Sequence, residues 1–490
     1  CISSALVDMN AKCGLLAEAQ NVFARLKVRE IVSWNALMTG LVEHGHNKDA
    51  LRCFHQIQED DVRPDSVTYL CCLKACSSTG NIDKGHEIHA EIAREGLEGS
   101  IIVGTTLIDM YSNFGLIAKA YIVFEKLFVR DIVSWNTLIM GCAGHGNANS
   151  ALKYFDYMKL EGIIPHIATF LSILKACSSL GWIGRGEEIH AEIVMKGLES
   201  DLFVGSSLID MYAKCGFLET AKKVFNTLPN HDVVSWNALI AGFTEYGCME
   251  EALNYFLKMQ CKGFSPDDFT FSCVLKSCAT VGSSEKSQEL HAEITRKGLE
   301  RDLIVGSTLI GAYSKCGSSA EAQDVFTLLP IRDVIAWTAL MAGYAQLGND
   351  TDVVELFNKM TREGIEPDPV SFTIVLNVCN HSGQLDKGPM YIQMINTTYS
   401  ITPTLVHHIC MVDLFGRAGN LDIAVAMIKK VPISDYLPIW ISLLGACQKW
   451  RNVKLGLLAF ENVVCWKKNH AAAYVCMGNI YAMKEEENNI

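Results

Sequence analysis

The stretch VSWNALIAGFTEYG, at residues 234–247, decides the fold because it returns along the chain in related form. The other copies are IVSWNALMTGLVEHG at 31–45, IVSWNTLIMGCAGHG at 132–146 and VIAWTALMAGYAQLG at 334–348. The tryptophans of the four copies are each 101 residues apart, and three copies of HAEI keep the same period. A long fixed period is typical of a repeat architecture, in which each block repeats one structural unit.

Each 101-residue block divides into sub-units of 35, 35 and 31 residues, as at 233–267, 268–302 and 303–333. Every sub-unit has the apolar periodicity of two amphipathic helices. Gly247 and Pro266 follow the two expected helices of the first sub-unit, where such residues end helices. A helix pair of this size cannot bury its apolar face alone, whereas stacked neighbours can. The sequence therefore predicts an all-α fold, a right-handed superhelical α-solenoid of helix-turn-helix repeats.

The bulk composition agrees with such an array. At 490 residues the chain exceeds one ordinary core, and its hydrophobic content of 49% is ample for burial. It has no run of about 18 uninterrupted apolar residues, so we expect a soluble protein that does not enter a membrane. The net charge of −12 is unusual for a nucleic-acid binder. Any affinity for nucleic acid would therefore depend on base contacts more than on neutralisation of phosphates.

Six of the 19 cysteines recur at two fixed repeat positions. The cysteines at one position precede a glycine, and the cysteines at the other position follow Lys-Ala or Lys-Ser. The two sets are Cys13, Cys215 and Cys316, and Cys76, Cys177 and Cys278. Recurrence once per block indicates packing, since free cysteine behaves as a small buried hydrophobe. We therefore expect neither disulfides nor a metal, and no cofactor.

An HxE motif occurs at His89, His190 and His291. A zinc deaminase needs HxE for one ligand and the proton-shuttling glutamate, followed by PCxxC for two more ligands. PCxxC is missing from the sequence, and the three copies of HxE fall at one repeat position. We interpret them as helix-surface residues. Without a Walker loop or GxSxG motif either, the chain is predicted not to be an enzyme.

The repeats resemble those of the pentatricopeptide repeat family, in its plant subclass with alternating P, L and S repeats. VVSWNALIAGFTEYGCMEEALNYFLKMQCKGFSPD at 233–267 is similar to the P type. TFSCVLKSCATVGSSEKSQELHAEITRKGLERD, ending at 302, is similar to the L type, and LIVGSTLIGAYSKCGSSAEAQDVFTLLPIRD at 303–333 to the S type. The resemblance covers the whole chain.

The last block is altered, since Trp440 follows Trp337 by 103 residues. Residues 405–436 resemble the variant S repeat that closes such arrays, and the residues from Ile439 and from Tyr474 resemble the first and second E motifs that follow it. The resemblance implies an array of about twelve repeats at 1–436, a first E motif at 437–470 and a truncated second one at 471–490. Within the array we expect an incomplete S repeat at 1–30, three P-L-S blocks at 31–333 and a terminal P-L-S block at 334–436.

This order of motifs implies a specificity factor that binds single-stranded organellar RNA and selects cytidines for C-to-U editing. The implied partners are the RNA and a DYW-type deaminase or other editing factors that bind the E motifs. The implied location is the mitochondrion or the chloroplast, with the mitochondrion favoured. The chain begins at Cys1, within a repeat, so we expect a fragment that lacks its targeting peptide. Two alternatives stay open, a protein-interaction scaffold and an RNA stability or splicing factor of the same family.

In this family the fifth and last residues of a repeat read one base, and the second residue packs against it. Carried onto this sequence, Asn35 with Asp65 and Asn237 with Asp267 resemble the pair that prefers uridine. The pairs that resemble the guanosine-preferring type are Thr105 with Asp131, Ser206 with Asp232, Ser307 with Asp333, and Thr338 with Asp368. The residues expected to pack against bases are Val32, Ile102, Val133, Phe203, Val234, Ile304 and Ile335.

Asn136 is paired with His166 where aspartate is usual, and we expect a poorly discriminated pyrimidine there. The L repeats mostly lack a polar fifth residue and should tolerate any base. From Ile31 onward the predicted site reads 5′-U-N-G-Y-N-G-U-N-G-G-N-3′. A second interpretation of the aspartates is that each N-caps the next helix, a role that aspartate fills well. The recurrent Trp is expected in the core.

Overall fold

The computed structural model describes residues 2–26, 28–429 and 437–488, and these residues form helices and connecting turns without a strand. The predicted α-solenoid of helical hairpins is confirmed. Residues 430–436, at the end of the expected terminal S repeat, lie outside the described residues, as do 489–490. The chain divides into two compact units, Cys1–Glu245 and Tyr246–Ile490, each with its own stack of helices.

One hairpin shows why the sequence folds in this way. In α21 (Val334–Gln346) the buried side chains include Trp337, Leu340 and Met341, which share one face at helical spacing. Gly348, with φ of 76°, then reverses the chain before α22 (Asp350–Arg362) begins. This left-handed backbone conformation costs glycine little, which explains why a glycine recurs at this place in the block.

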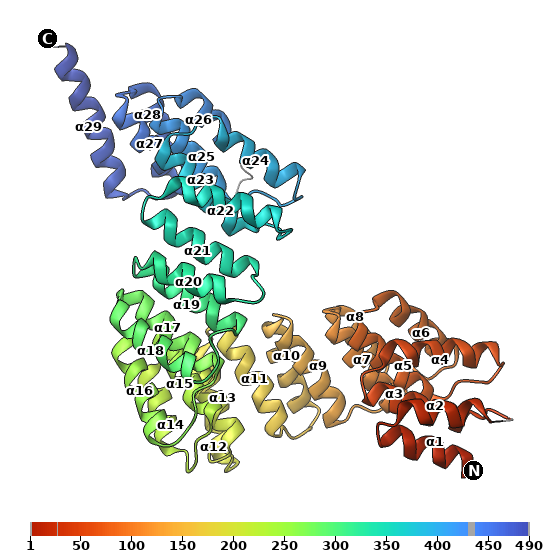
Figure 1. The fold of residues 1–490 in the computed structure, drawn as a ribbon. Helices are drawn as coiled ribbons and strands as arrows, with labels where there is room; N and C mark the ends of the chain where they lie inside the picture. Colours follow the sequence, from red (N-terminus) through yellow and green to blue (C-terminus); the bar gives the residue numbers. More distant parts are fainter. Residues whose placement is uncertain (1, 27, 430–436, 489–490) are drawn as a thin grey trace. The chain divides into compact units, whose positions relative to one another are not determined.

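The first unit is a stack of hairpins in two layers (Figure 1). The first helix of each hairpin packs on the first helix of the next, so that α1, α3, α5, α7, α9, α11, α13 and α15 form one layer. The second helices form the other layer. The bounds are α1 Ile2–Lys12, α2 Leu16–Ala24, α3 Ile31–Glu43, α4 Asn47–Glu59, α5 Ser66–Thr79, α6 Ile82–Arg94, α7 Ile101–Asn113, α8 Ile117–Glu125, α9 Ile132–Gly144, α10 Ala148–Leu160, α11 Ile167–Leu180, α12 Ile183–Met195, α13 Leu202–Lys214, α14 Leu218–Thr227 and α15 Val233–Glu245.

The second unit repeats this arrangement, with α17, α19, α21, α23, α25 and α27 packed in succession. The last helix, α29, packs on both α27 and α28. The remaining bounds are α16 Met249–Cys261, α17 Asp268–Val281, α18 Ser284–Arg296, α19 Leu303–Lys315, α20 Ser319–Leu328, α23 Pro369–Ser382, α24 Lys387–Thr397, α25 Leu405–Arg417, α26 Leu421–Ile428, α27 Leu437–Lys449, α28 Val453–Trp466 and α29 Ala471–Asn488. Among the described helices, none is both long and apolar enough to cross a membrane.

The recurrent tryptophans lie in the core, as predicted. Trp34 is fully buried, and its ring meets that of Phe23 edge to face with the centroids 4.4 Å apart. The same contact recurs at each copy of the motif, which makes it a repeated element of hairpin stacking. The other pairs are Trp135 with Phe124, Trp236 with Phe225 and Trp337 with Phe326.

Candidate nucleic-acid interface

A row of apolar side chains lies exposed near the start of the first helices. The seven residues predicted to pack against bases are 55% to 68% exposed, although each is aliphatic or aromatic. They are Val32, Ile102, Val133, Phe203, Val234, Ile304 and Ile335. Solitary exposed apolar residues are ordinary, but recurrence at one position of successive helices forms a regular surface within each unit. Such a surface can cover the apolar faces of unstacked bases.

The row includes residues that the sequence prediction missed. Val67, Phe269 and Val370 are the second residues of L repeats and are 43%, 51% and 54% exposed. Val406 occupies the same place in α25 and is 48% exposed. The spacing of 35 residues from Val32 to Val67 could have revealed the first of them. The row of exposed apolar side chains is therefore more continuous than the row that was predicted from the P and S repeats alone.

The structure brings Asn35 and Asp65 together as a hydrogen-bonded pair. The Asn35 Nδ2 group donates to both carboxylate oxygens of Asp65, at 2.9 and 3.0 Å. Thr68 Oγ1 donates to Asn35 Oδ1 at 2.7 Å, and its backbone N–H donates to Asp65 Oδ1 at 2.9 Å. The side chain of Asn35 is only 8% exposed. The predicted reading pair is thus part of a bonded junction between two repeats.

The altered pair in the second block also meets. Asn136 Nδ2 lies 3.2 Å from Nε2 of His166, and Thr169 Oγ1 donates to Asn136 Oδ1 at 2.6 Å. The contacts between the two repeats are therefore retained although histidine replaces aspartate. Asn237 and Asp267 belong to different units. Asn237 is 8% exposed on α15, and Asp267 caps α17 through a 2.8 Å bond from the Thr270 backbone.

The serine and threonine pairs are arranged differently. Ser206 Oγ donates to the Leu202 carbonyl of its own helix at 2.8 Å. Ser307 and Thr338 do the same at 2.6 and 2.9 Å, and Thr105 is half-buried. Within the described chain, no hydrogen bond joins these hydroxyls to their partner aspartates. The structure therefore separates two kinds of predicted reading pair, one bonded and one not.

All six aspartates of the predicted pairs N-cap a helix, so the capping interpretation describes their geometry correctly. Each accepts a hydrogen bond from the backbone N–H three residues later, at 2.7 to 2.9 Å. In four of them the bonds between described residues engage Oδ1 alone, which leaves Oδ2 as an acceptor for a further donor. These four are Asp131, Asp232, Asp333 and Asp368. Capping and base reading are therefore compatible for one carboxylate.

Models of the PPR repeat family match residues 29–78, 130–179, 231–280 and 332–381. A second PPR repeat model matches 67–97, 206–233 and 307–332, and together the matches cover more than half of the chain. The chain belongs to the pentatricopeptide repeat family.

Curated relatives of this pentatricopeptide repeat chain come from Arabidopsis thaliana. Pentatricopeptide repeat-containing protein At4g33990 is 33% identical over 483 residues, covering 98% of this chain and 58% of that protein. The chloroplastic protein At1g11290 is 34% identical over 476 residues, covering 97% of this chain and 59% of that protein. The mitochondrial protein At4g19191 is 34% identical over 484 residues, covering 98% and 74%. The chain thus spans less than two thirds of the length of the first and second of these.

Solved pentatricopeptide repeat structures share the fold. The maize protein PPR10 superposes with a TM-score of 0.61 at 16% identity, covering 98% of this chain and 81% of that one. PPR10 in complex with an 18-nt psaJ RNA element gives a TM-score of 0.66 at 18% identity, covering 97% and 71%. At these identities the likeness establishes the fold of the array.

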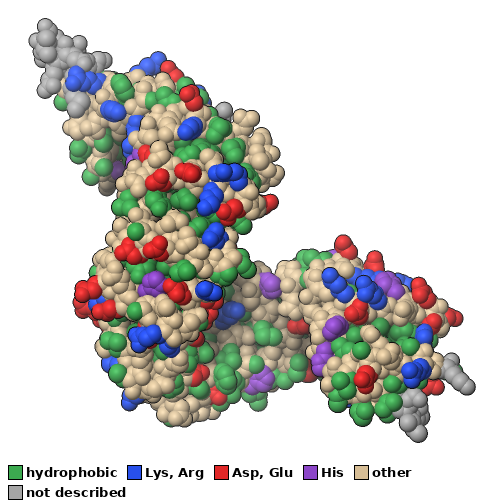
Figure 2. All heavy atoms as spheres, viewed as in Figure 1, with side chains coloured by type: hydrophobic (Ala, Val, Ile, Leu, Met, Phe, Trp, Pro, Cys, Tyr) green, Lys and Arg blue, Asp and Glu red, His purple; other side chains and the backbone are tan. Residues whose placement is uncertain are grey.

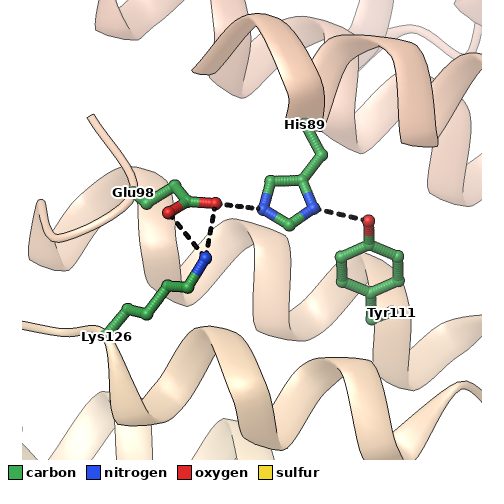
Figure 3. Close-up of polar contacts among 4 residues, drawn as sticks. All are labelled: His89, Glu98, Tyr111 and Lys126. Atoms are coloured by element: carbon green, nitrogen blue, oxygen red, sulfur yellow. Dashed lines mark hydrogen bonds and ion pairs between the residues drawn. The ribbon is translucent and has the colours of Figure 1, made fainter. Parts of the chain in front are cut away.

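The HxE residues of the pentatricopeptide array are engaged in contacts between repeats. Figure 3 shows His89 between Tyr111 and Glu98, hydrogen-bonded to them at 2.6 and 2.8 Å, while Lys126 pairs with Glu98 at 2.9 Å. Burial lowers the pKa of His89, against the opposing effect of Glu98. Tyr212 and Tyr313 meet the other two motif histidines in the same way.

The motif glutamates contact the preceding hairpin instead. Gln58 donates to Glu91 at 3.0 Å, and Lys159 pairs with Glu192 at 2.7 Å. Histidine and glutamate of one HxE motif therefore bond to different neighbours. Within the part of the chain that the structure describes, no three His, Cys, Asp or Glu side chains form a group that could hold a metal ion.

The recurrent cysteines divide into two classes. Cys76, Cys177 and Cys278 are fully buried, as predicted, and burial raises the pKa of each thiol to about 11. The other set follows a first helix at its C-terminal end. Cys13 is exposed there, and Cys215 is half-buried. The packing prediction was therefore wrong for Cys13, because that position lies at the helix end and not on the buried face.

Charged side chains of both signs are interspersed on the face of each unit that Figure 2 shows. Several bridge neighbouring hairpins, as Arg130 does with Glu161 at 3.0 Å. Such exposed pairs contribute little to stability, typically about 0–1 kcal/mol. The acidic net charge is thus spread over a surface of mixed charge. The exposed apolar row and the polar pairs beside it are the features that recur from repeat to repeat.

Proposed function

We propose that the chain binds single-stranded RNA with one repeat facing one base. The observation that carries this proposal is the row of exposed apolar second residues beside the polar fifth and last residues. An apolar side chain can cover the face of an unstacked base, while polar groups meet its Watson–Crick edge. The RNA bound to PPR10, a solved structure of the same fold, supports the proposal.

We further propose that the RNA is organellar and that binding selects cytidines for C-to-U editing. The alternating P, L and S repeat lengths and the resemblance of 437–470 and 471–490 to E motifs support this role. The names of the relatives At1g11290, chloroplastic, and At4g19191, mitochondrial, support an organelle without choosing between the two. The deaminase would be a separate partner that docks on the E motifs, so the chain itself would select the site without catalysing the reaction.

Binding to synthetic RNA tests the first proposal. An oligonucleotide with the sequence 5′-U-N-G-Y-N-G-U-N-G-G-N-3′ should bind more tightly than a scrambled one of the same composition in a gel-shift titration. Equal affinity for the two would contradict sequence-specific binding and would favour the protein-interaction scaffold that the net charge of −12 suggests.

An exchange of fifth residues sharpens the test. Asn35→Thr should change the preferred first nucleotide from uridine towards guanosine, because it creates the pair found at Thr105 with Asp131. Ser206→Asn should make the opposite change at the sixth nucleotide. Each variant serves as the control for the other, since a general loss of affinity would not move the two preferences in opposite directions.

The editing role has its own test. Disrupting the gene should abolish C-to-U conversion at an organellar cytidine a few nucleotides downstream of a matching sequence, measured by sequencing of transcripts. A change in transcript level or splicing with all conversions intact would instead support an RNA stability or splicing factor.

A further inference from the structure

Thr68 is a fully buried hydroxyl at the junction of two repeats. Its Oγ1 accepts a hydrogen bond from the backbone N–H of Asp65 at 3.2 Å. It also lies 2.7 Å from Asn35 Oδ1 and 3.0 Å from Asp65 Oδ1. Because a hydroxyl has one hydrogen, and a backbone donor already approaches this oxygen, the hydrogen is directed at these two acceptors. The shorter distance is the one to the asparagine.

The second block repeats the contact without the aspartate. Thr169, which is also fully buried, donates to Asn136 Oδ1 at 2.6 Å although His166 stands at the end of the repeat. The His166 backbone N–H donates to Thr169 Oγ1 at 3.2 Å, as that of Asp65 does to Thr68. The last residue contacts the amide nitrogen in both junctions but changes from aspartate to histidine, whereas the threonine that donates to the amide oxygen is the same in both.

The fourth block provides a natural comparison. There the fifth residue is Thr338, and Ser371 occupies the place of the threonine. Ser371 Oγ donates to Asp368 Oδ1 at 2.7 Å, whereas the hydroxyl of Thr338 bonds to the Val334 carbonyl of its own helix. The hydroxyl of the third residue thus contacts the fifth residue in the first and second blocks, where that residue is asparagine, and not in the fourth block, where it is threonine. In the sequence, Asn237 and Thr270 form the third such combination.

The direction of the amide decides which pyrimidine it fits. With the hydroxyl donating to Oδ1, the Asn35 amide directs Nδ2 at the Asp65 carboxylate. The reversed amide would place two acceptors face to face at the carboxylate, and the Thr68 hydroxyl would have to turn its hydrogen from the amide oxygen at 2.7 Å to Asp65 Oδ1 at 3.0 Å. Uracil presents an N–H beside a carbonyl oxygen, and cytosine presents a ring nitrogen acceptor beside an amino group. Reversing the amide therefore exchanges a match to uracil for a match to cytosine.

We propose that Thr68 and Thr169 are positioning residues that hold the amides of Asn35 and Asn136 in one direction and so set the preference for uridine over cytidine. The inference rests on the proposed binding of RNA. It adds to the fifth and last residues a third side chain, the third residue of the following repeat, which acts through the asparagine and not by touching the base.

Removal of the hydroxyl at nearly constant shape tests this inference. Affinities of the wild type and of Thr68→Val are measured for the predicted RNA with uridine or cytidine at its first nucleotide. We expect the ratio of the two affinities to fall by about three- to tenfold in Thr68→Val, the usual weight of one hydrogen bond. Thr68→Ser, which retains the hydroxyl, should restore the ratio. Discrimination at the third nucleotide, which faces Thr105 and Asp131, should be unchanged in both variants.

Ser371→Ala is the matched control, because it removes the equivalent capping hydroxyl where that hydroxyl does not touch the fifth residue. It should leave discrimination at the tenth nucleotide unchanged. Thr169→Val gives an independent variant should Thr68→Val fail to fold. The pairing of Asn136 with His166 alone predicts poor discrimination at the fourth nucleotide, whereas this inference requires the wild type to prefer uridine there and Thr169→Val to lose that preference.

A wild-type ratio in Thr68→Val, a failure of Thr68→Ser to restore it, or an equal loss in Ser371→Ala would overturn the positioning role. Failure of the wild type itself to distinguish the predicted RNA from a scrambled one would instead overturn the proposed function, so the two failures are distinguishable.

Discussion

The ring of Trp337 meets the ring of Phe326 edge to face, with the centroids 4.7 Å apart and the planes at 74°. Both side chains are almost completely buried, and the contact joins the second helix of one hairpin to the first helix of the next. Since each hairpin buries its apolar face only against its neighbours, this contact belongs to the interface that makes the stack cooperative.

Trp337→Ala should lower the free energy of unfolding by about 3–5 kcal/mol, the usual cost of truncating a buried aromatic residue. Urea denaturation followed by circular dichroism measures this loss. Trp466 is 54% exposed and provides the control, because Trp466→Ala should change the free energy by about 0.5 kcal/mol or less. Similar losses in the two variants would contradict the role assigned to the buried pair.

Gly343→Ala should destabilise the protein even though alanine favours helix by about 1 kcal/mol. A Cβ at this position would lie 2.4 Å from Ser314 Oγ and 2.6 Å from its Cβ, so α21 could not remain as close to α19. Gly311→Ala in α19 is the control, since a Cβ there meets no atom within 4 Å. We expect the melting temperature to fall in the first variant and to rise slightly in the second. A rise in both would show that the close approach is unimportant.

Acidification should destabilise the fold through buried histidines. Burial lowers the pKa of His89, His190 and His407 below the ordinary value of 6.5. The unfolded chain therefore binds protons at a higher pH than the folded chain does. The neutral histidines stabilise the folded state fully above pH 6.5, and this stabilisation is lost as the pH falls from that value towards the lower pKa of the folded state. Urea unfolding should give a smaller free energy at pH 5.5 than at pH 7.5.

His190→Gln removes one of these groups and should reduce the difference between the two pH values. The His190 ring of the wild type is hydrogen-bonded to the Tyr212 hydroxyl at 2.9 Å, so the variant also loses this contact. The difference between the two pH values, and not the absolute stability, is therefore the quantity to compare. A difference as large as that of the wild type would exclude His190 as a contributor.

Asp333 allows helix capping to be separated from base reading. Asp333→Ala should cost about 1 kcal/mol of stability, because the Ala336 backbone N–H loses its acceptor at 2.9 Å. Asp333→Asn should retain most of that stability, since asparagine caps as well as aspartate. It should nevertheless reduce the preference for guanosine at the ninth nucleotide, because an amide presents donors where the carboxylate only accepts. Unchanged preference in Asp333→Asn would leave capping as the sole role of this carboxylate.

Much of the fold could be predicted because its determinants recur. The spacing of Trp34 and its copies defined the block, and the buried position of those tryptophans followed from their apolar neighbours. The glycine that follows most first helices, such as Gly348, indicated the turn correctly. Local patterns of this kind repeat the same physical constraint in every block and are therefore easy to recognise.

The candidate site was less predictable because its contacts join residues far apart in the sequence. The bond between Thr68 and Asn35 spans 33 residues, and the local pattern around Thr68 does not distinguish it from the bond that Ser371 makes to Asp368. The exposure of Cys13 depends similarly on where one helix ends. Long-range side-chain direction is set by packing, and only the structure specifies it.

The capping aspartates have a consequence for how the array can change. At Asp131, Asp232 and Asp333 the carboxylate that caps a helix is also the one that would read a base, so a substitution by a residue that cannot cap would alter folding and recognition together. Among the described residues, the Ser206 and Ser307 hydroxyls bond only within their own helices and do not cap one. Mutational drift towards a new target should therefore proceed first through the fifth residues, while the aspartates change slowly.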